Sequence, residues 1–269
     1  MTMLDIDFGQ ATDPGKVRTN NEDSIGSFLP DSRQQSRSHG YLFALADGVG
    51  GLDFGEVASA TAISALTEGF RKAQAGTMLI NLLPRLIQNA NAAVHDSALV
   101  PDRRGNKMAT TIVACALRYD QAVISNVGDS RCYLVRNGVA RILSTDHTWV
   151  NEQRKLGIIS AEEMATSDSR HILIRSLGPE MFVTADTTAI TVLAGDVLML
   201  CCDGLYGGLD EHDIAGILSQ NKSAEELAKE LVSTSVENDG TDNTTTQVIK
   251  VRAVERVGMY RGRPYHLRS

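Results

Sequence analysis

The sequence predicts an α+β protein that folds as a four-layer α-β-β-α sandwich, in which two antiparallel sheets are flanked by pairs of helices. Three observations lead to this prediction. Helical patterns come in pairs between groups of strand-like runs. The regular alternation of single strands and single helices that builds a doubly wound parallel sheet is absent. Asn137-Gly138 joins two strand-like runs as a hairpin.

The N-terminal part of the chain carries two predicted strands and two predicted helices. Leu4–Gly9 alternates weakly, and Tyr41–Ala46 is an apolar run typical of a buried strand. The polar segment Asp31–Gly40 between them is predicted as a loop. A helix is expected to begin near Phe54. The next helix has apolar residues at the spacing of a helix packed on a core: Leu79, Leu82, Leu83, Leu86, Ile87 and Ala90.

Strands dominate the middle of the chain. Two β-rich runs precede the hairpin around Asn137-Gly138, and a second hairpin is predicted around Ala194-Gly195. The predicted strands are Thr110–Arg118, Ala122–Val127, Arg131–Arg136, Val139–Leu143, Thr187–Val192 and Asp196–Cys202.

The C-terminal elements complete one large domain, residues 1–253. A capping box at Ser223–Glu226 begins a helix that runs to about Val236, and Thr245–Arg252 is predicted as the last strand. Residues 254–269 are basic and lack periodicity, which predicts a flexible tail or the start of a linker. Residues 148–176 are polar and are predicted to form a small helical insertion on a few apolar anchors: Trp149, Leu156, Ile158 and Ile159.

Composition excludes some classes of function. The 269 residues have a formal net charge of −7, and an acidic chain is a poor candidate for nucleic-acid binding. The N-terminus lacks a signal-peptide pattern, and no apolar run approaches the roughly 20 residues of a membrane span. We therefore expect no nucleic-acid or membrane partner, a cytoplasmic location and a monomer. The cysteines are expected to be buried, reduced thiols in strands: Cys115, Cys132, Cys201 and Cys202.

The most informative pattern is a set of acidic residues beside small turn residues. Asp47, Asp129 and Asp203 each follow an apolar, strand-like run, and Asp242 stands in the segment Gly240–Asn243. For any one Asp-Gly pair a simple turn is the better interpretation. Because the pattern recurs after strands, it favours carboxylates that converge on one point. Such oxygen ligands suit Mg²⁺ or Mn²⁺.

The predicted chemistry is that of a dinuclear metal centre. A carboxylate that bridges two divalent ions holds them roughly 3.5–4 Å apart, where they activate a shared water and orient a phosphate. The Gly48 carbonyl is a further candidate ligand. In the segment Arg18–Ser24, Arg18 suits a phosphate, and Glu22 and Asp23 suit metal-bound waters. The alternative for this segment is a polar turn with an exposed ion pair, and read alone it is the favoured interpretation.

Other catalytic patterns are missing. The six histidines have no zinc-site spacing and are each expected on the surface or in a loop. No Gly-x-Ser-x-Gly elbow is present, and Gly50-Gly51 lacks the lysine of a phosphate-binding Walker loop.

Taken together, these motifs resemble the metal-dependent serine/threonine protein phosphatases, the PPM or type 2C family, in its bacterial form. The similarity extends from about Phe8 to Val251 and is highly specific because the order and spacing of all the motifs agree. It is carried by Arg18–Ser24, Ala44–Gly51, Gly55–Ser59, Thr110-Thr111, Gly128–Leu134, Cys202–Leu205 and Asp242-Asn243.

The resemblance implies roles for individual residues. Asp47 would bridge two Mg²⁺ or Mn²⁺ ions, with the Gly48 carbonyl, Asp203 and Asp242 completing the ligands. Asp129 would help to bind a third, weaker ion. Glu22 and Asp23 would lie near metal-bound waters, Arg18 would hold the substrate phosphate, and residues 148–176 would be the flap that influences substrate access.

Three places depart from the family pattern, one of them the stretch Asp239-Gly240-Thr241 before Asp242, where a second small residue is common. Many members carry a histidine, proposed as the general acid, where this chain has Val49, although bacterial members usually have a bulkier apolar residue there. Bacterial members also often carry a histidine after the Gly-Gly pair, where this chain has Leu52. The Val49 side chain cannot donate a proton, so the identity of the proton donor stays open.

The sequence therefore predicts a phosphatase that hydrolyses phosphoserine and phosphothreonine in proteins, opposing a bacterial serine/threonine kinase. A metal-activated water would attack phosphorus directly. Two alternatives share the fold. One is a catalytically weak module that binds phosphoproteins, and the other is a partner-switching regulator that acts on one phosphorylated antagonist.

Overall fold

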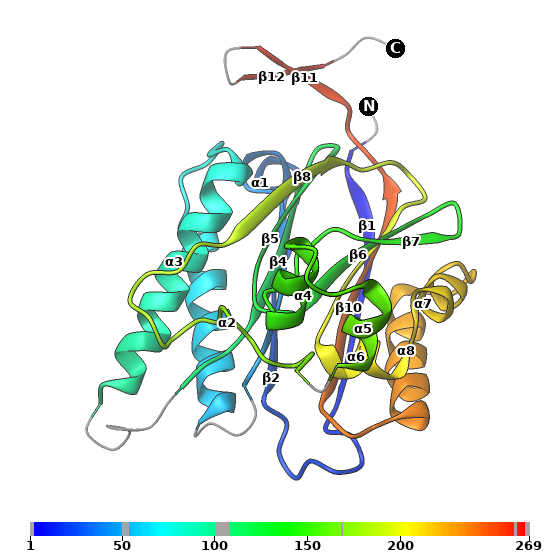
Figure 1. Ribbon diagram of the computed structural model, residues 1–269. Coiled ribbons are helices and arrows are strands. Elements are labelled where there is room, and N and C mark those ends of the chain that lie inside the picture. Colours follow the sequence, from blue (N-terminus) through cyan, green and yellow to red (C-terminus); the bar gives the residue numbers. More distant parts are fainter. Residues whose placement is uncertain (1–2, 50–53, 101–107, 168, 261–262, 267–269) are drawn as a thin grey trace.

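The computed structural model describes residues 3–49, 54–100, 108–167, 169–260 and 263–266. Two five-stranded antiparallel sheets lie face to face, with α2 and α3 covering one outer face and α7 and α8 the other (Figure 1). The predicted four-layer sandwich is confirmed. Among the described residues no helix is long and apolar enough to cross a membrane.

One sheet has the strand order β1-β10-β9-β6-β7 and the other β2-β3-β4-β5-β8. The first consists of β1 (Asp5–Asp13), β10 (Thr244–Ala253), β9 (Val197–Cys201), β6 (Arg131–Arg136) and β7 (Val139–Ile142). The second consists of β2 (Asp23–Phe28), β3 (Tyr41–Asp47), β4 (Ile112–Arg118), β5 (Gln121–Val127) and β8 (Asp186–Thr191). The helices are α1 (Arg33–Ser38), α2 (Gly55–Arg71), α3 (Leu79–Ala98), α4 (Trp149–Lys155), α5 (Ala161–Thr166), α6 (Asp203–Gly208), α7 (Glu211–Leu218) and α8 (Ala224–Asn238).

The strand β3 shows why its sequence is apolar throughout. Phe43 and Leu45 belong to the core between the two sheets, whereas Leu42, Ala44 and Ala46 pack under α2 and α3. Because side chains alternate across a strand and both faces of this strand are covered, a continuous apolar run is required. The helix α3 buries every residue of its predicted stripe in the same hydrophobic cluster as Leu42, Ala44 and Ala46.

Local signals place the helix ends correctly. Ser223 accepts a hydrogen bond from the Glu226 amide and forms the predicted capping box of α8. The hairpin of β6 and β7 around Asn137-Gly138 is also confirmed, with both turn residues at positive φ.

The second predicted hairpin is wrong. β8 pairs with β5, whereas β9 pairs with β6 and β10 in the other sheet. The segment between them passes from one sheet to the other, and Asp196 holds it by accepting from the Leu193 amide at 2.7 Å and from Arg136. A glycine between two β-rich runs indicates a turn, but it does not determine which strands pair.

Two segments predicted to lack regular structure contain it. Ser32 caps the short helix α1 inside the predicted loop Asp31–Gly40. The C-terminal segment, predicted as a flexible tail or linker, forms a two-stranded ribbon of β11 (Val257–Tyr260) and β12 (Arg263–His266).

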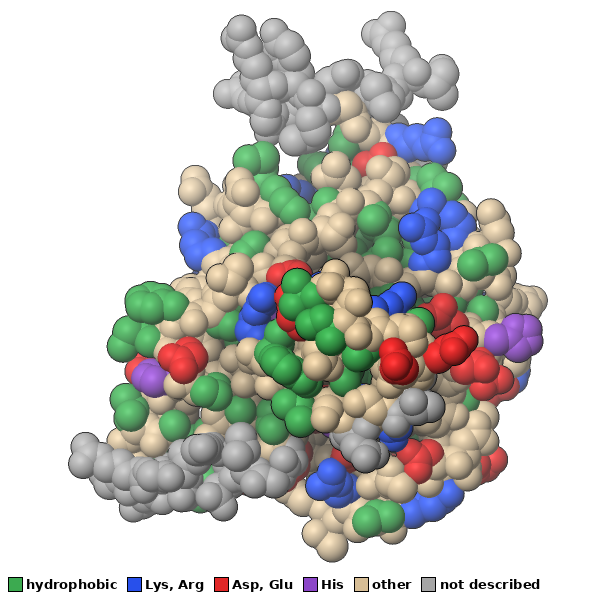
Figure 2. All heavy atoms as spheres, in the orientation of Figure 1, with side chains coloured by type: hydrophobic (Ala, Val, Ile, Leu, Met, Phe, Trp, Pro, Cys, Tyr) green, Lys and Arg blue, Asp and Glu red, His purple; other side chains and the backbone are tan. Residues whose placement is uncertain are grey.

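The insertion between β7 and β8 contains the helices α4 and α5, as predicted, but its anchors differ. Trp149, Leu156 and Ile158 are 49%, 68% and 63% exposed, whereas Val150 is 1% exposed. Figure 2 shows hydrophobic side chains gathered on the face where this insertion lies. The insertion is fixed by Val150 and by polar contacts at its two ends, and most of its large apolar side chains remain in solvent.

Candidate metal centre

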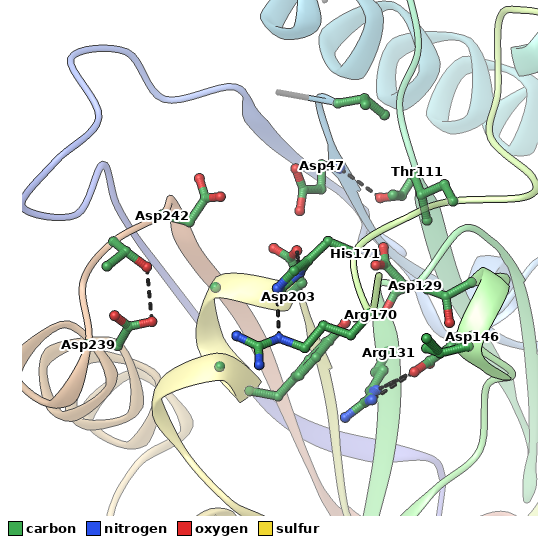
Figure 3. Close-up of a pocket in the computed structure, with 18 of the residues that line it drawn as sticks. Asp47, Thr111, Asp129, Arg131, Asp146, Arg170, His171, Asp203, Asp239 and Asp242 are labelled. Carbon is green, nitrogen blue, oxygen red and sulfur yellow. Dashed lines mark hydrogen bonds and ion pairs between the residues drawn. The ribbon is translucent and has the colours of Figure 1, made fainter. Parts of the chain in front are cut away.

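Segments that are far apart in the sequence meet in one cavity of about 860 Å³ at the edge of the two sheets. Figure 3 shows the acidic side chains around this cavity. Seven of the eight predicted site residues line it, the exception being Asp23: Arg18, Glu22, Asp47, Gly48, Asp129, Asp203 and Asp242.

The sheet fixes Asp47 at the end of β3. The Asp47 amide donates to the Thr111 hydroxyl at 3.0 Å, and its carbonyl accepts from the Thr111 amide at 2.8 Å and the Thr110 hydroxyl at 2.7 Å. These bonds hold the backbone and leave the carboxylate directed into the cavity. Asp203 is held on a second rigid element because it is the first residue of α6, directly after β9.

Glycine is required at position 48 by close packing. A Cβ atom there would lie 2.6 Å from the Gly55 backbone and 2.9 Å from the Glu22 side chain. Only a residue without a side chain lets the end of β3 approach the start of α2 so closely. Next to it, Val49 lines the cavity and donates its amide to the Ala109 carbonyl. Leu52 and Gly50-Gly51 lie outside the described residues.

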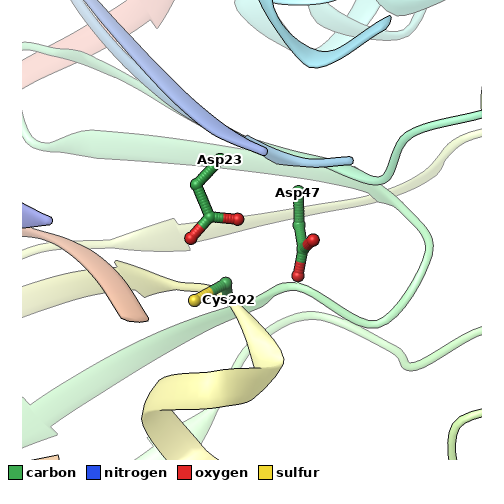
Figure 4. Close-up of side chains that lie close together, drawn as sticks. All are labelled: Asp23, Asp47 and Cys202. Carbon is green, nitrogen blue, oxygen red and sulfur yellow. The ribbon is translucent and has the colours of Figure 1, made fainter. Parts of the chain in front are cut away.

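Asp23 lies behind Asp47, away from the cavity surface. The ligand atoms of Asp23, Asp47 and Cys202 all lie within 4.8 Å of one another (Figure 4). Both Asp23 carboxylate oxygens are buried and lack a hydrogen-bond partner of good geometry among the described residues. Burial raises the pKa of Asp23 to about 7, an effect that Thr245 and Cys202 partly offset. In the described part of the metal-free protein, few hydrogen bonds and no neighbouring positive charge offset the cost of burying the Asp23 carboxylate.

The other acidic groups repel one another. Burial and then the charges of Asp23 and Asp203 raise the pKa of Asp47 well above its usual value. Burial, followed by Asp203 and Asp146, raises the pKa of Asp129 to about 8. Such a set of converging, mutually repelling oxygen donors favours hard divalent cations, which offset the repulsion. The donor set therefore fits Mg²⁺ or Mn²⁺.

The loop that carries Arg18 is tied to the segment that carries Asp242, directly before β10. Asn243 accepts from the Glu22 amide at 2.8 Å and donates its own amide group to the Asn20 carbonyl at 2.9 Å. Arg18 itself donates to the Asp242 carboxylate at 2.7 Å, and both side chains are partly exposed. In the structure these two residues bind each other.

Three site features were missed by the sequence analysis. His171, in the insertion between β7 and β8, places its Nδ1 3.7 Å from the Asp203 carboxylate, and its pKa is raised chiefly by its interaction with that carboxylate. Cys202 occupies the N-cap position of α6, with its sulfur close to the carboxylates of Asp23 and Asp47. Asp146 lines the cavity and pairs with Arg131. No local motif marks Asp146 or His171, because both reach the site through contacts between distant segments, whereas Cys202 directly precedes the predicted ligand Asp203.

His147 lies in a loop, one of the two places expected for the histidines, but it is buried there and does not face solvent. It is 2% exposed, accepts from the Gly128 amide at 3.1 Å, and contacts Arg175. Burial and then Arg175 lower the pKa of His147, so the ring stays neutral and serves as a structural link. All four cysteines are buried and unpaired, as predicted, but Cys202 lies at a helix start and not in a strand.

The chain is similar to proteins of known activity over nearly its whole length. A family model described as Protein phosphatase 2C matches residues 18–246. The chain is 34% identical over 255 residues to the serine/threonine phosphatase Stp of Listeria innocua, which covers 94% of this chain and 96% of that protein.

Solved structures of serine/threonine phosphatases are also similar to this chain. The serine/threonine phosphatase of S. agalactiae superposes with a TM-score of 0.83 at 30% identity, covering 92% of this chain and 100% of that one. The catalytic domain of the serine threonine protein phosphatase PstP, in complex with two manganese ions, superposes with a TM-score of 0.78 at 31% identity, covering 93% and 99%.

Proposed function

Because this chain belongs to the protein phosphatase 2C family and is a metal-dependent serine/threonine phosphatase, we propose that the carboxylates around its cavity hold two Mg²⁺ or Mn²⁺ ions. The observation that carries this proposal is the convergence of buried carboxylates whose pKa values are raised by burial and mutual repulsion. Binding of dications relieves that repulsion.

We assign the ligands by their place in the cavity. Asp47, Asp203, Asp242 and the Gly48 carbonyl would hold the two ions, which supply an activated water and offset phosphoryl charge. Asp129 would serve a third, weaker ion.

Two further acids would support the ligands. Glu22 lines the cavity, where burial and the neighbouring Glu56 raise its pKa, so it suits a hydrogen bond to a bound water. Asp23, behind Asp47, would fix the orientation of that ligand.

Arg18 is proposed to hold the substrate phosphate. Its bond to Asp242 is exposed, and such a pair contributes little stability, so exchange of partners costs little. A metal ion at Asp242 would free the guanidinium for a phosphate, which it can bind through two hydrogen bonds.

The cellular setting is part of the proposal. The substrates are phosphorylated proteins, and the opposing enzyme would be a bacterial serine/threonine kinase. Unpaired thiols at all four cysteines favour a reducing compartment, which supports a cytoplasmic location. The flap lines the cavity through residues of both its helices and would influence substrate access. A catalytically weak binding module and a partner-switching regulator are not favoured, since the named relatives are serine/threonine phosphatases.

Calorimetric titration with MnCl₂ tests the ligand assignment. The chain should bind two ions tightly and a third weakly. Asp129→Asn should lose the weak step and keep the two tight ones, because it removes a ligand from the third position alone. Loss of a tight step in Asp129→Asn, or three unaffected steps, would contradict the assignment. Arg33→Gln, on the surface helix α1, serves as the unaffected control.

Arg18→Ala should raise the KM for a phosphothreonine peptide by roughly 10- to 100-fold with a smaller change in kcat, since a bidentate charged hydrogen bond is lost. Inhibition by inorganic phosphate should weaken by a similar factor. Arg18→Lys should recover only part of the affinity because it cannot bind in bidentate fashion. Unchanged phosphate inhibition in Arg18→Ala would assign phosphate binding to another group.

A further inference from the structure

Arg131 is a mostly buried arginine that the proposed reaction does not use. Its Nε and Nη2 donate to the Asp146 carboxylate at 3.1 and 2.7 Å, and its Nη1 donates to the Tyr133 hydroxyl at 3.0 Å (Figure 3). The Arg131 and Asp146 side chains are only 18% and 11% exposed. A buried ion pair is costly to form, so its value lies in the geometry that it fixes.

The guanidinium face of Arg131 contacts a second element of the site. It lies 3.6 Å from the ring centroid of Tyr206 in α6, the helix whose first residue is Asp203. The Tyr206 hydroxyl donates to the Asp129 carbonyl at 3.2 Å. Asp129 lies in the turn of residues 128–131 between β5 and β6, and Arg131 is the last residue of that turn and the first of β6. Tyr206 therefore contacts this turn twice and ties it to α6.

Both ends of the flap meet Asp146 and His147, which in turn contact residues 128–131. The Asp146 carbonyl accepts from the Asn151 side chain of α4 at 2.6 Å. The His147 amide donates to the Gly128 carbonyl at 3.0 Å, and the His147 carbonyl accepts from the Ile174 amide at 2.9 Å. The turn of residues 128–131 is therefore linked directly to the helix that carries Asp203, and through Asp146 and His147 to the start and the end of the flap.

We propose that Arg131 is a positioning residue that couples the order of the flap to metal binding at Asp129. This inference rests on the proposed role of Asp129 as a ligand of the third ion. A guanidinium performs this role because it is planar and always charged, and it presents donors in its plane and a stacking face to Tyr206 at once. A lysine can form only one part of this arrangement.

The test uses a charge-neutral pair, since a single Arg131 variant would leave Asp146 buried and unpaired. Arg131→Gln/Asp146→Asn should weaken the weak Mn²⁺ step by roughly 10-fold, the usual effect of losing support behind a ligand. In the metal-free chain, hydrogen exchange of the α4 amides should become at least about 10-fold faster, because local opening becomes easier. The tight Mn²⁺ steps should not change.

A matched control lies on the same strand. Arg136 binds Asp196 through two hydrogen bonds at 2.8 and 2.6 Å, at the end of β6 remote from the flap. Arg136→Gln/Asp196→Asn removes an equivalent pair and should change neither the weak Mn²⁺ step nor exchange in α4. Equal effects in both double variants would mean general loss of stability and would overturn the inference.

Tyr206→Phe keeps the inference testable if the double variant does not fold. It removes one hydroxyl and keeps the stacked ring, so it should weaken the weak Mn²⁺ step by a factor of about 3 to 10. An unchanged weak step in Tyr206→Phe, with that step lost in Asp129→Asn, would refute the coupling and leave the ligand role of Asp129 standing. If Asp129→Asn keeps every step, the ligand role fails and the coupling fails with it.

Discussion

Asp47→Asn is expected to abolish turnover and, at the same time, to leave the metal-free protein at least as stable as the parent. The asparagine removes a proposed bridging ligand, which should lower kcat by at least about 100-fold. It also removes a buried negative charge that Asp23, Asp203 and Asp129 repel. An inactive variant that is no less stable distinguishes a functional carboxylate from a structural one.

Two measurements on the same preparation check this. Hydrolysis of a phosphothreonine peptide with Mn²⁺ gives kcat, and thermal unfolding in EDTA gives the stability of the metal-free chain. The control is Asp239→Asn, whose carboxylate lines the same cavity but accepts from the Thr241 hydroxyl at 3.0 Å and should keep activity. Retained turnover in Asp47→Asn would exclude it as an essential ligand, and strong destabilisation in EDTA would make its role structural.

Removal of metal is expected to abolish activity and to make the protein less stable as the pH rises. In the metal-free chain the pKa of Asp23 is raised to about 7 and that of Asp129 to about 8, from 3.8. The folded state therefore holds protons that the unfolded chain has released, and stability falls as the pH rises from the unfolded pKa through these folded values. Between about pH 6.5 and about pH 8.5 the expected loss is roughly 3 kcal/mol.

Urea unfolding across this pH range, in EDTA and in Mn²⁺, measures the effect. Since metal ions bind the deprotonated carboxylates, stability in Mn²⁺ should rise with pH, opposite to its course in EDTA. Asp23→Asn should remove the smaller part of the pH dependence in EDTA, near pH 7, and leave the larger part that Asp129 contributes near pH 8. His147, whose pKa is lowered, acts mainly below pH 6.5 and so lies outside the window. If stability in EDTA rises with pH instead, the protein itself must stabilise the ionised carboxylates without a metal ion.

Tertiary structure decided which strands pair, because a glycine-containing turn looks alike whether the chain folds back or crosses over. The runs on either side of Ala194-Gly195 were predicted as one hairpin, yet they belong to different sheets. Their partners β5 and β10 are far away in sequence, and pairing depends on the burial that those partners offer. The same limit hid Asp146 and His171, which reach the site only through contacts between distant segments.

The sequence by itself determined the layers of the fold and the acidic residues of the centre. Both are local properties. Apolar spacing defines the buried face of α3. An acidic residue beside a small one after an apolar run places Asp47 and Asp203 at the ends of strands. Only the tertiary structure decided that Asp23 lies behind Asp47 and that Arg131 joins the flap to α6. Those contacts arise from packing between distant elements, which no short-range periodicity encodes.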